Sequence, residues 1–321
     1  MAVRPKILVT RRLPEPVEAR ASASYEALLN REDRPIPAAD IPHLAAGMDG
    51  ILCTITDRLS AAVIAALPAS LRILATFSVG FEHIDLAAAK ARGLPVTNTP
   101  GALTEATADI AFLLLLGAAR RAWEGERLLR QDGWQGWAPT QLMGVELAGK
   151  RLGIVGMGRI GQAVAHRAQA FGMQVHYTGR AERDLPPAIA ARYHAQDSDM
   201  LPLCQFLSLH MASNAETRRW LNAERIARLP KGAIVVNTAR GDVVDDEALI
   251  AALASRHLAA AGLDVFAGEP NLDKRYLALD NTMLLPHLGS ATFETRCAMG
   301  FKALDNLDAF FAGKEPPDRV A

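Results

Sequence analysis

Residues 151–161 read RLGIVGMGRIG, and this stretch decides the fold because a short apolar run leads directly into a glycine-rich turn. Arg151–Val155 has the length and the branched side chains of a buried strand, Gln162–Phe171 continues as a helix, and Gln174–Tyr177 follows as a second strand. A glycine-rich turn alone is an ordinary feature. Between a strand and a helix, and with another strand behind it, the turn predicts a dinucleotide-binding βαβ unit.

Each glycine of this turn has a separate physical reason. Gly156 permits the tight turn, Gly158 lets the backbone approach a pyrophosphate, and Gly161 lets helix and strand pack closely. Arg159 and Ile160 open the helix, whose free N–H groups and positive dipole end favour phosphate binding. We therefore expect all five residues to contact the cofactor.

The rest of the chain also alternates short apolar strands with Ala/Leu-rich helical stretches, which predicts parallel, buried sheets. The other predicted strands are Lys6–Thr10, Gly50–Thr54, Ile73–Thr76, Pro95–Thr97, Phe206–His210, Ala233–Asn237, Ala261–Val265 and Met283–Leu285. Predicted helices include Ser60–Leu67, Gln162–Ala170, Glu105–Arg121 and Thr292–Phe311.

Turn chemistry at Asn98–Gly101 and a second break near Leu284–Pro286 divide the chain into two domains. The residues after the second break are too few for a domain of their own. We expect an α/β protein with two doubly wound parallel-sheet domains, in which residues 101–281 bind NAD(P) and are inserted into a discontinuous substrate domain of residues 1–100 and 282–321.

Composition excludes several classes of function. Among 321 residues, Lys+Arg and Asp+Glu both total 35, so no basic field attracts nucleic acid. The 3 cysteines are widely spaced, which argues against disulfides and a zinc site. Lys6–Thr10 reads as a strand rather than a signal peptide, and Ile110–Ala119 is too short to cross a bilayer. We expect a cytoplasmic protein without metal, membrane or nucleic-acid partners.

The end of the second strand of the βαβ unit bears on the choice of cofactor. An NAD enzyme usually places Asp or Glu there for the ribose hydroxyls, but here Gly179 and Arg180 follow Thr178. Arg180 can pair with a 2′-phosphate, helped by the Thr178 hydroxyl and by Arg183, which predicts NADPH preference with NADH possible. Two alternatives remain: Arg180 as a solvated surface charge, and Glu182 folding back to favour NAD.

Three polar segments each follow a predicted strand, at the sheet edge where parallel α/β proteins bind ligands: Asn237–Asp242, Asp264–Pro270 and Pro286–Ser290. Reduction of a keto acid needs a cation to polarise the carbonyl, and Arg240 suits this role. It also needs an acid; an imidazole ordinarily changes charge near neutral pH, so His287 fits. Glu269 can orient the ring and favour its protonated form.

Each of these three residues also has a simpler explanation. Arg240 can be a surface charge at a helix end, Glu269 a turn cap and His287 a hydrogen-bonded loop histidine. The three together are more specific, because each follows a strand in the same half of the sheet.

These three segments resemble the signatures of the D-2-hydroxyacid dehydrogenase family, and the likeness extends over essentially the whole chain. It is closest to the glyoxylate/hydroxypyruvate reductases. The segments that carry the closer likeness are Val9–Pro14, Ser78–Gly80, Gly133–Trp137, Tyr177–Arg180 and Ser290–Thr292 with Arg296.

The resemblance implies a small 2-keto acid substrate and a catalytic trio of Arg240, Glu269 and His287. It also implies that the backbone N–H groups of Val79 and Gly80 hold the substrate carboxylate. Substrate-binding candidates are therefore Val79, Gly80, Arg240, Ser290 and Trp137. The remaining cofactor-binding candidates are Thr107, His210, Thr217, Thr238, Ala239, Asp264, His287 and Gly289; for Thr107 a role in helix packing is equally open.

The resemblance also makes Asp132–Gly149, a segment rich in Trp, Gly and Pro, part of a homodimerisation region. Trp137 then reaches toward the partner's active site and limits substrate size, or else packs in the interface. His210-Met211-Ala212 departs from the family's His-x-Pro pattern, which affects the expected loop near the nicotinamide ribose and leaves the trio untouched.

Two rival functions remain open. One is an NAD-linked family member acting on D-lactate, phosphoglycerate or formate, against which the Tyr177–Arg180 segment argues. The other is a nucleotide-sensing binding module without catalysis, which would not need Arg240, Glu269 and His287 together.

Overall fold

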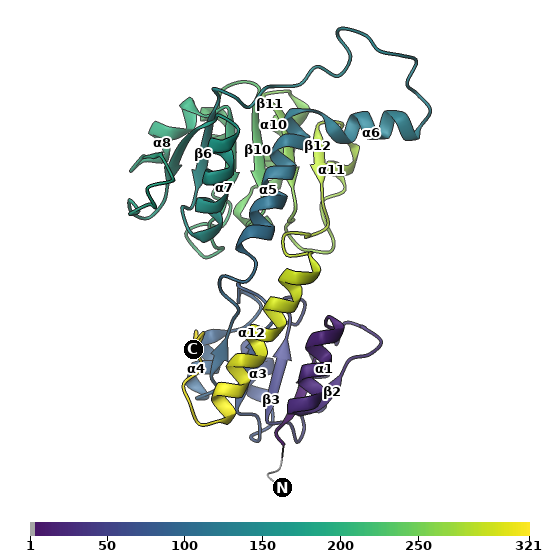
Figure 1. Ribbon diagram of the computed structural model, residues 1–321, viewed down its shortest axis with the longest axis vertical. Coiled ribbons are helices and arrows are strands. Elements are labelled where there is room, and N and C mark those ends of the chain that lie inside the picture. The colour runs from purple at the N-terminus through teal and green to yellow at the C-terminus, as the bar shows by residue number, and fades with distance from the viewer. Residues whose placement is uncertain (1–3) are drawn as a thin grey trace. The chain divides into compact units, whose positions relative to one another are not determined.

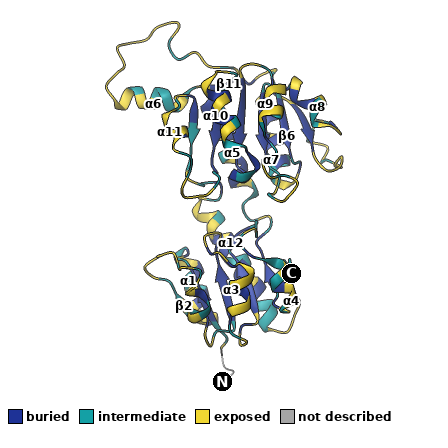
Figure 2. Ribbon diagram, turned by 180° about the vertical axis from the view of Figure 1, so that it is seen from behind, coloured by how far each residue is buried: buried dark blue, intermediate teal, exposed yellow. Residues whose placement is uncertain are grey.

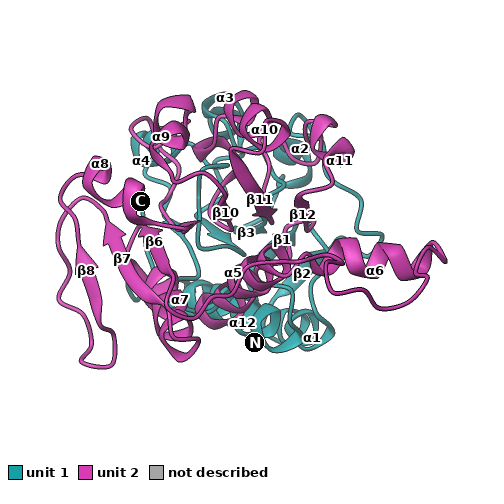
Figure 3. Cartoon of the chain, turned by 90° about the horizontal axis from the view of Figure 1, so that it is seen from above, with its two compact units in different colours: residues 1–103, 291–321 teal, residues 104–290 magenta. Residues whose placement is uncertain are grey.

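The computed structural model describes residues 4–321, which form two compact units. The first comprises residues 1–103 and 291–321, and the second is the continuous stretch 104–290 (Figure 3). The first unit is discontinuous and the second is inserted into it, and two boundaries differ from those we expected. Residues 101–103, which we assigned to the NAD(P)-binding domain, belong to the first unit. Residues 282–290, which we assigned to the substrate domain, belong to the second unit, because Thr282–Leu284 pairs with the strand Leu258–Leu263 of that unit's sheet.

The first unit is built on a five-stranded sheet in the order β2-β1-β3-β4-β5, and every strand pair is parallel. Its strands are β1 (Lys6–Val9), β2 (Glu26–Leu29), β3 (Gly50–Cys53), β4 (Ile73–Thr76) and β5 (Val96–Thr97). Its helices are α1 (Glu15–Ser24), α2 (Ile41–Leu44), α3 (Ala61–Ala66), α4 (Leu86–Ala91) and α12 (Phe293–Phe311).

Both faces of this sheet are covered, because neighbouring strand residues point to opposite sides. Leu8 and Leu74 pack with the helices α2, α3 and α4 in one buried cluster. Ile7 and Ile73 pack with α1 and α12 in the other. Helices on both faces explain why β3 and β4 are buried at every position, as expected for strands inside a parallel sheet.

The second unit contains a seven-stranded sheet in the order β12-β11-β10-β9-β6-β7-β8, again with all pairs parallel. Its strands are β6 (Arg151–Val155), β7 (Gln174–Thr178), β8 (Ala191–Tyr193), β9 (Phe206–Leu209), β10 (Ala233–Asn237), β11 (Leu258–Leu263) and β12 (Thr282–Leu284). Its helices are α5 (Thr104–Ala119), α6 (Ala122–Arg130), α7 (Arg159–Ala170), α8 (Asp197–Met200), α9 (Ala223–Arg228), α10 (Asp246–Ala254) and α11 (Arg275–Ala278), with short 3-10 turns at Leu201–Leu203 and Gly241–Val243.

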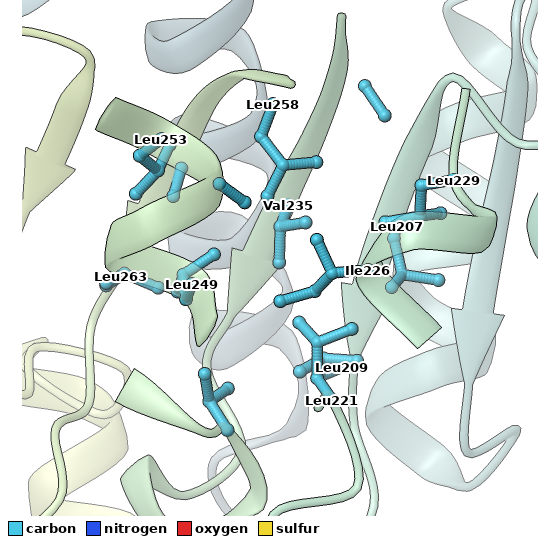
Figure 4. Close-up of a cluster of buried hydrophobic side chains, with 14 of the residues drawn as sticks. Leu207, Leu209, Leu221, Ile226, Leu229, Val235, Leu249, Leu253, Leu258 and Leu263 are labelled. Carbon is cyan, nitrogen blue, oxygen red and sulfur yellow. The ribbon is translucent and has the colours of Figure 1, made fainter. Parts of the chain in front are cut away.

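Two buried clusters cover the two faces of this larger sheet. Val235 of β10 packs with α9 and α10 on one face, where Figure 4 shows Ile226 and Leu249 turned toward it. Ile234 and Val236, its neighbours along the strand, lie in the cluster that contains α5 and α7. The central strands of this unit are accordingly buried, whereas the outer faces of its helices are exposed (Figure 2).

The strand order reverses between β6 and β9. From β6 the chain proceeds outward through β7 to β8, and it then returns to place β9 on the other side of β6. Open α/β sheets bind ligands at the carboxyl ends of the strands where the order reverses. The glycine-rich turn after β6 and His210 after β9 both lie at this point.

Every strand predicted from the sequence is present, and β2 and β8 were missed. Both are short strands at sheet edges with little burial, so they carry no continuous apolar run. The segment Asp132–Gly149 contains neither helix nor strand and loops out beyond α6, as expected for an irregular arm (Figure 1). Among the described residues, no helix is both long and apolar enough to span a bilayer.

Candidate active site and cofactor site

The glycine-rich turn has the geometry that its sequence predicts. Gly156 has a φ of 98°, and a Cβ there would lie 2.9 Å from the backbone of His210. A Cβ on Gly161 would lie 2.3 Å from the Gly156 carbonyl oxygen, so helix and strand pack too closely for any side chain. A Cβ on Gly158 would meet no atom within 4 Å, which leaves open space beside the uncapped start of α7. This open space is where a pyrophosphate could approach the backbone and the first N–H groups of Arg159 and Ile160.

His210 lies across the point where the strand order reverses. Its backbone N–H donates to the Val155 carbonyl at 2.8 Å, and its Nε2 lies 2.7 Å from the Ser208 hydroxyl. Burial lowers the pKa of His210 to about 4, so the ring is neutral at physiological pH. Within the described part of the chain, the buried Nδ1 atom of this ring has no hydrogen-bond partner.

The segment after β7 presents its cationic side chain to solvent. Thr178 is buried, whereas Gly179, Arg180, Glu182 and Arg183 are all exposed. The backbone N–H of Arg183 donates to the Tyr177 hydroxyl at 3.0 Å, which fixes the course of the loop. Across residues 4–321, neither Arg180 nor Glu182 makes a side-chain ion pair, so an incoming phosphate would face no competing internal partner at Arg180.

A hydrogen-bonded turn after β10 positions Arg240. The buried Asn237 side chain donates to the Arg240 carbonyl at 2.8 Å and accepts the Ala239 N–H at 2.9 Å. Arg240 itself also donates to the Ala239 carbonyl at 2.7 Å. Thr238 lies inside this turn, and its buried hydroxyl has no partner among residues 4–321.

Asp264, directly after β11, holds the loop that carries the histidine. One carboxylate oxygen accepts the Leu288 N–H at 2.6 Å, and the other accepts the Gly289 N–H at 2.8 Å. Burial raises the pKa of this carboxyl group, while these two N–H donors act in the opposite direction. Thr107 on α5 donates to the Gly289 carbonyl at 3.0 Å, so its hydroxyl holds the same loop from the helix side.

Glu269 and His287 form the pair that the sequence predicts. Nδ1 of His287 lies 2.7 Å from Oε2 of Glu269, and Oε1 of Glu269 accepts the Phe266 N–H at 2.8 Å. Burial raises the pKa of Glu269, but the hydrogen bond to His287, the charges of His287 and Arg240 and the Phe266 N–H together hold it below its ordinary value. The carboxylate is therefore ionised at neutral pH, and the Arg240 charge acts on the same group.

The remaining predicted residues are less closely grouped. Ser290 is partly buried at the end of the second unit, and the Thr217 hydroxyl is used within its own turn, donating to the Ala212 carbonyl at 2.7 Å. Trp137 is 81% exposed. Val79 and Gly80 lie in the first unit, in the loop after β4.

Comparison with known proteins identifies the family. The model of the D-isomer specific 2-hydroxyacid dehydrogenase NAD-binding domain matches residues 112–289. The chain is 46% identical to glycerate dehydrogenase of Hyphomicrobium methylovorum, with 97% of each chain covered. It is 41% identical to glyoxylate reductase of Korarchaeum cryptofilum, covering 99% of this chain and 96% of the relative.

The chain belongs to the D-isomer specific 2-hydroxyacid dehydrogenase family. A solved structure of an NADPH-dependent glyoxylate/hydroxypyruvate reductase from Sinorhizobium meliloti, in complex with NADP and malonate, has a TM-score of 0.89 and 36% identity, with 99% of this chain and 97% of that chain covered. The protein is thus an NAD(P)-dependent 2-hydroxyacid dehydrogenase with the two parallel-sheet domains of its family.

The residues of this dehydrogenase fit a bound dinucleotide. The space at Gly158 adjoins the open helix N-terminus, and the partnerless buried atoms His210 Nδ1 and Thr238 Oγ1 both lie just beyond carboxyl ends of neighbouring strands. Buried polar atoms normally have partners, so two such atoms at the carboxyl ends of the strands, where open α/β sheets bind ligands, indicate groups that a ligand completes.

Sequence reasoning missed the supporting residues. Asn237 and Ser208 hold Arg240 and His210 in place through hydrogen bonds. The sequence also did not predict that both carboxylate oxygens of Asp264 accept N–H groups of the loop after His287. A signal was available for Asn237, a buried polar residue at the end of an otherwise apolar strand. No signal was available for the partner of Asp264, because the hydrogen-bonded N–H groups belong to the backbone 24 and 25 residues later.

Proposed function

We propose that this enzyme reduces a small 2-keto acid, glyoxylate or hydroxypyruvate, to glycolate or D-glycerate, with NADPH as its preferred reductant. The observation that carries the proposal is the 2.7 Å pair of His287 and Glu269, with Arg240 acting on the same carboxylate. The names of the related glycerate dehydrogenase and glyoxylate reductase support the same substrate class.

When bound, the reduced nicotinamide supplies a hydride to the keto carbon. Negative charge then develops on the keto oxygen, and Arg240 stabilises it because a guanidinium is permanently charged. His287 supplies the proton from Nε2, since Glu269 occupies Nδ1. Glu269 fixes the orientation of the ring and stabilises the charged imidazolium before the proton is transferred.

The preference for NADPH rests on Arg180 and Thr178. An acidic residue at the end of β7 would repel a 2′-phosphate, but this chain has Gly179 there. Arg180 follows Gly179, is exposed and can pair with the phosphate. The NADPH-dependent reductase from Sinorhizobium meliloti, crystallised with NADP, is consistent with this assignment. Glu182 is the residue that would favour NADH if the loop folded back over the ribose.

The substrate-binding residues contact the carboxylate, which glyoxylate and hydroxypyruvate share. We assign the substrate carboxylate to the N–H groups of Val79 and Gly80 in the first unit, and we keep Arg240 and Ser290 of the second unit as substrate-binding candidates. Glyoxylate and hydroxypyruvate differ by one hydroxymethyl group, which changes binding in an apolar pocket by only about 1–3 kcal/mol. Both acids are therefore expected to react.

We also propose a homodimer built on α6 and the arm that follows it. No residue of α6 is buried within this chain, and Leu129, Trp134 and Met143 are 62%, 51% and 66% exposed. A cavity of about 290 Å³ in the same region is lined in part by Trp123 and Met143. Large apolar side chains gathered on one segment are typical of an interface. Sedimentation should give twice the mass of one chain, and replacing Trp134 with Glu should shift the protein to monomer.

The experiment that tests the reaction follows NADPH and then NADH absorbance with glyoxylate, hydroxypyruvate and pyruvate. We expect fast NADPH oxidation with the first two acids and slower oxidation of NADH. A clear NADH preference would overturn the cofactor assignment and point to Glu182. Tight cofactor binding without turnover of any acid would instead support a nucleotide-sensing module.

A further inference from the structure

Three successive carbonyl groups around the loop after β4 are each held by a named donor. The Thr99 N–H donates to the Ser78 carbonyl at 2.9 Å, and the Asn98 side chain donates to the Val79 carbonyl at 2.7 Å. The Ser78 hydroxyl donates to the Gly80 carbonyl at 2.6 Å. Two of these three carbonyls belong to Val79 and Gly80, the residues assigned to the substrate carboxylate.

The held carbonyls determine where the N–H groups point. In a trans peptide, the C=O of one residue and the N–H of the next lie in one plane and point in opposite directions. Holding the Ser78 carbonyl therefore directs the Val79 N–H, and holding the Val79 carbonyl directs the Gly80 N–H. Across residues 4–321 neither N–H has an intramolecular acceptor, so both remain available to a ligand.

The third carbonyl, that of Gly80, shares its peptide plane with the Phe81 N–H, so holding it fixes the loop immediately after the two N–H groups. It is held by a hydroxyl relay whose donor directions follow from hydrogen counting. Ser78 has a single hydroxyl hydrogen, and the Gly80 carbonyl uses it. The 2.8 Å contact between Thr76 and Ser78 must then be donated by Thr76. Thr76 has no hydrogen left for its 3.0 Å contact with Nε2 of His83, so His83 is the donor.

The two hydroxyl residues of the relay and Asn98 are buried, and Asn98 is hydrogen-bonded to α12 of the first unit. Thr76 is fully buried, and Ser78 and Asn98 are nearly so. Asn306 of α12 donates to the Asn98 carbonyl at 3.3 Å, which fixes the residue that holds Val79. Hydrogen bonds in a dry environment hold geometry more firmly than exposed ones do.

We propose that Asn98, which holds the Val79 carbonyl, and His83, Thr76 and Ser78, which hold the Gly80 carbonyl and so fix the loop on its other side, are positioning residues that preset the Val79 and Gly80 N–H groups to receive the substrate carboxylate. The assignment rests on the proposed function, because it presumes a carboxylate substrate at this loop. None of the four residues needs to touch the substrate. Their effect is to remove the cost of ordering the two N–H groups at each binding event.

The test compares Thr76→Val, which keeps the shape and removes the relay, with Thr76→Ser, which keeps the hydroxyl. The probes are glyoxylate as substrate and oxamate, a carboxylate analogue whose amide carbonyl resists reduction. Thr76→Val should raise the KM for glyoxylate and the dissociation constant of oxamate about tenfold, the usual worth of one hydrogen bond. Thr76→Ser should restore both values, and NADPH binding measured by fluorescence should stay unchanged in both variants.

Equal effects of Val and Ser, or unchanged glyoxylate and oxamate constants in Thr76→Val, would overturn the inference. Should Thr76→Val fail to fold, His83→Leu and His83→Gln give the same contrast, because glutamine retains a donor N–H. The oxamate measurement also distinguishes failure of the proposed function from failure of this inference. A wild-type enzyme that neither reduces glyoxylate nor binds oxamate contradicts the proposed function and this inference together. If the wild type reduces glyoxylate and binds oxamate, and Thr76→Val has the same KM and dissociation constant, only this inference is contradicted.

Discussion

Nδ1 of His287 lies 2.7 Å from Oε2 of Glu269, while the other oxygen of that carboxylate accepts the Phe266 N–H at 2.8 Å. Both oxygens of the carboxylate are thus held, one by the imidazole and the other by the backbone. The backbone of His287 has a φ of 55°, a conformation uncommon outside glycine, and its N–H donates to the Asp264 carbonyl at 2.9 Å. Backbone and side chain are therefore both constrained, which fits the role of proton donor that we propose for His287.

Replacing His287 with Gln should lower kcat about 10²- to 10⁴-fold, because the amide cannot supply the proton. Binding of NADPH, measured by fluorescence, should change little. Comparable losses in turnover and cofactor binding would mean that His287 supports the pocket and is not the acid.

Glu269→Gln should move the pH dependence of the reduction. The reaction requires a protonated imidazole, so its rate falls as pH rises. Glu269 is ionised at neutral pH because its pKa is lowered by His287 and Arg240, and this negative charge stabilises the imidazolium. Without the charge, the fall in kcat/KM for glyoxylate should begin at lower pH. A profile that stays in place would show that Glu269 only orients the ring.

Arg180→Ala should reduce kcat/KM for NADPH about 10- to 100-fold, since a charge-assisted bond to phosphate is lost, and leave the NADH value nearly unchanged. Glu182→Gln is the matched variant of the same loop and should leave both values close to wild type. The assignment fails if Arg180→Ala affects both cofactors alike, or if Glu182→Gln selectively weakens NADH.

The lowered pKa of His210 predicts that the free energy of unfolding depends on pH. Burial lowers its folded-state pKa to about 4 from an ordinary value of 6.5, so between these values the unfolded chain binds a proton that the folded chain does not. Stability from this group is present above pH 6.5 and is lost as pH falls toward 4, by roughly 1–3 kcal/mol. Urea unfolding at pH 7 and pH 5 should show a smaller loss for His210→Gln than for wild type. His176 and His194, whose pKa values burial also lowers, remain in both proteins and so cancel in the comparison.

The sequence predicted those parts of the molecule that local pattern determines. The turn around Gly156 and Gly158 and the buried strands have periodic or compositional signals, and the structure has them where expected. The edge strand β2 has alternating, half-exposed residues in the order EALL and no such signal. Likewise, the relay from His83 to Gly80 depends on side chains meeting in space, which residue order alone does not reveal.

The boundary between the units shows the same limit. Met283–Leu285 is a recognisable strand, but its sequence does not say which sheet it joins. Its pairing with Leu258–Leu263 decides that question and brings His287 into the same unit as Asp264 and Glu269. The sequence predicted the contact between Glu269 and His287, whereas it did not predict that both residues lie in one unit.

The proposed reduction is measured without steady-state complications in a single-turnover experiment, in which enzyme saturated with NADPH is mixed with glyoxylate and the reduced-nicotinamide absorbance is followed. We expect rapid loss of one NADPH equivalent per site in the wild type. In His287→Gln, NADPH should remain bound and the absorbance should decay at least about a hundredfold more slowly. Equal decay in both proteins, or no decay in the wild type with either glyoxylate or hydroxypyruvate, would contradict the proposed mechanism.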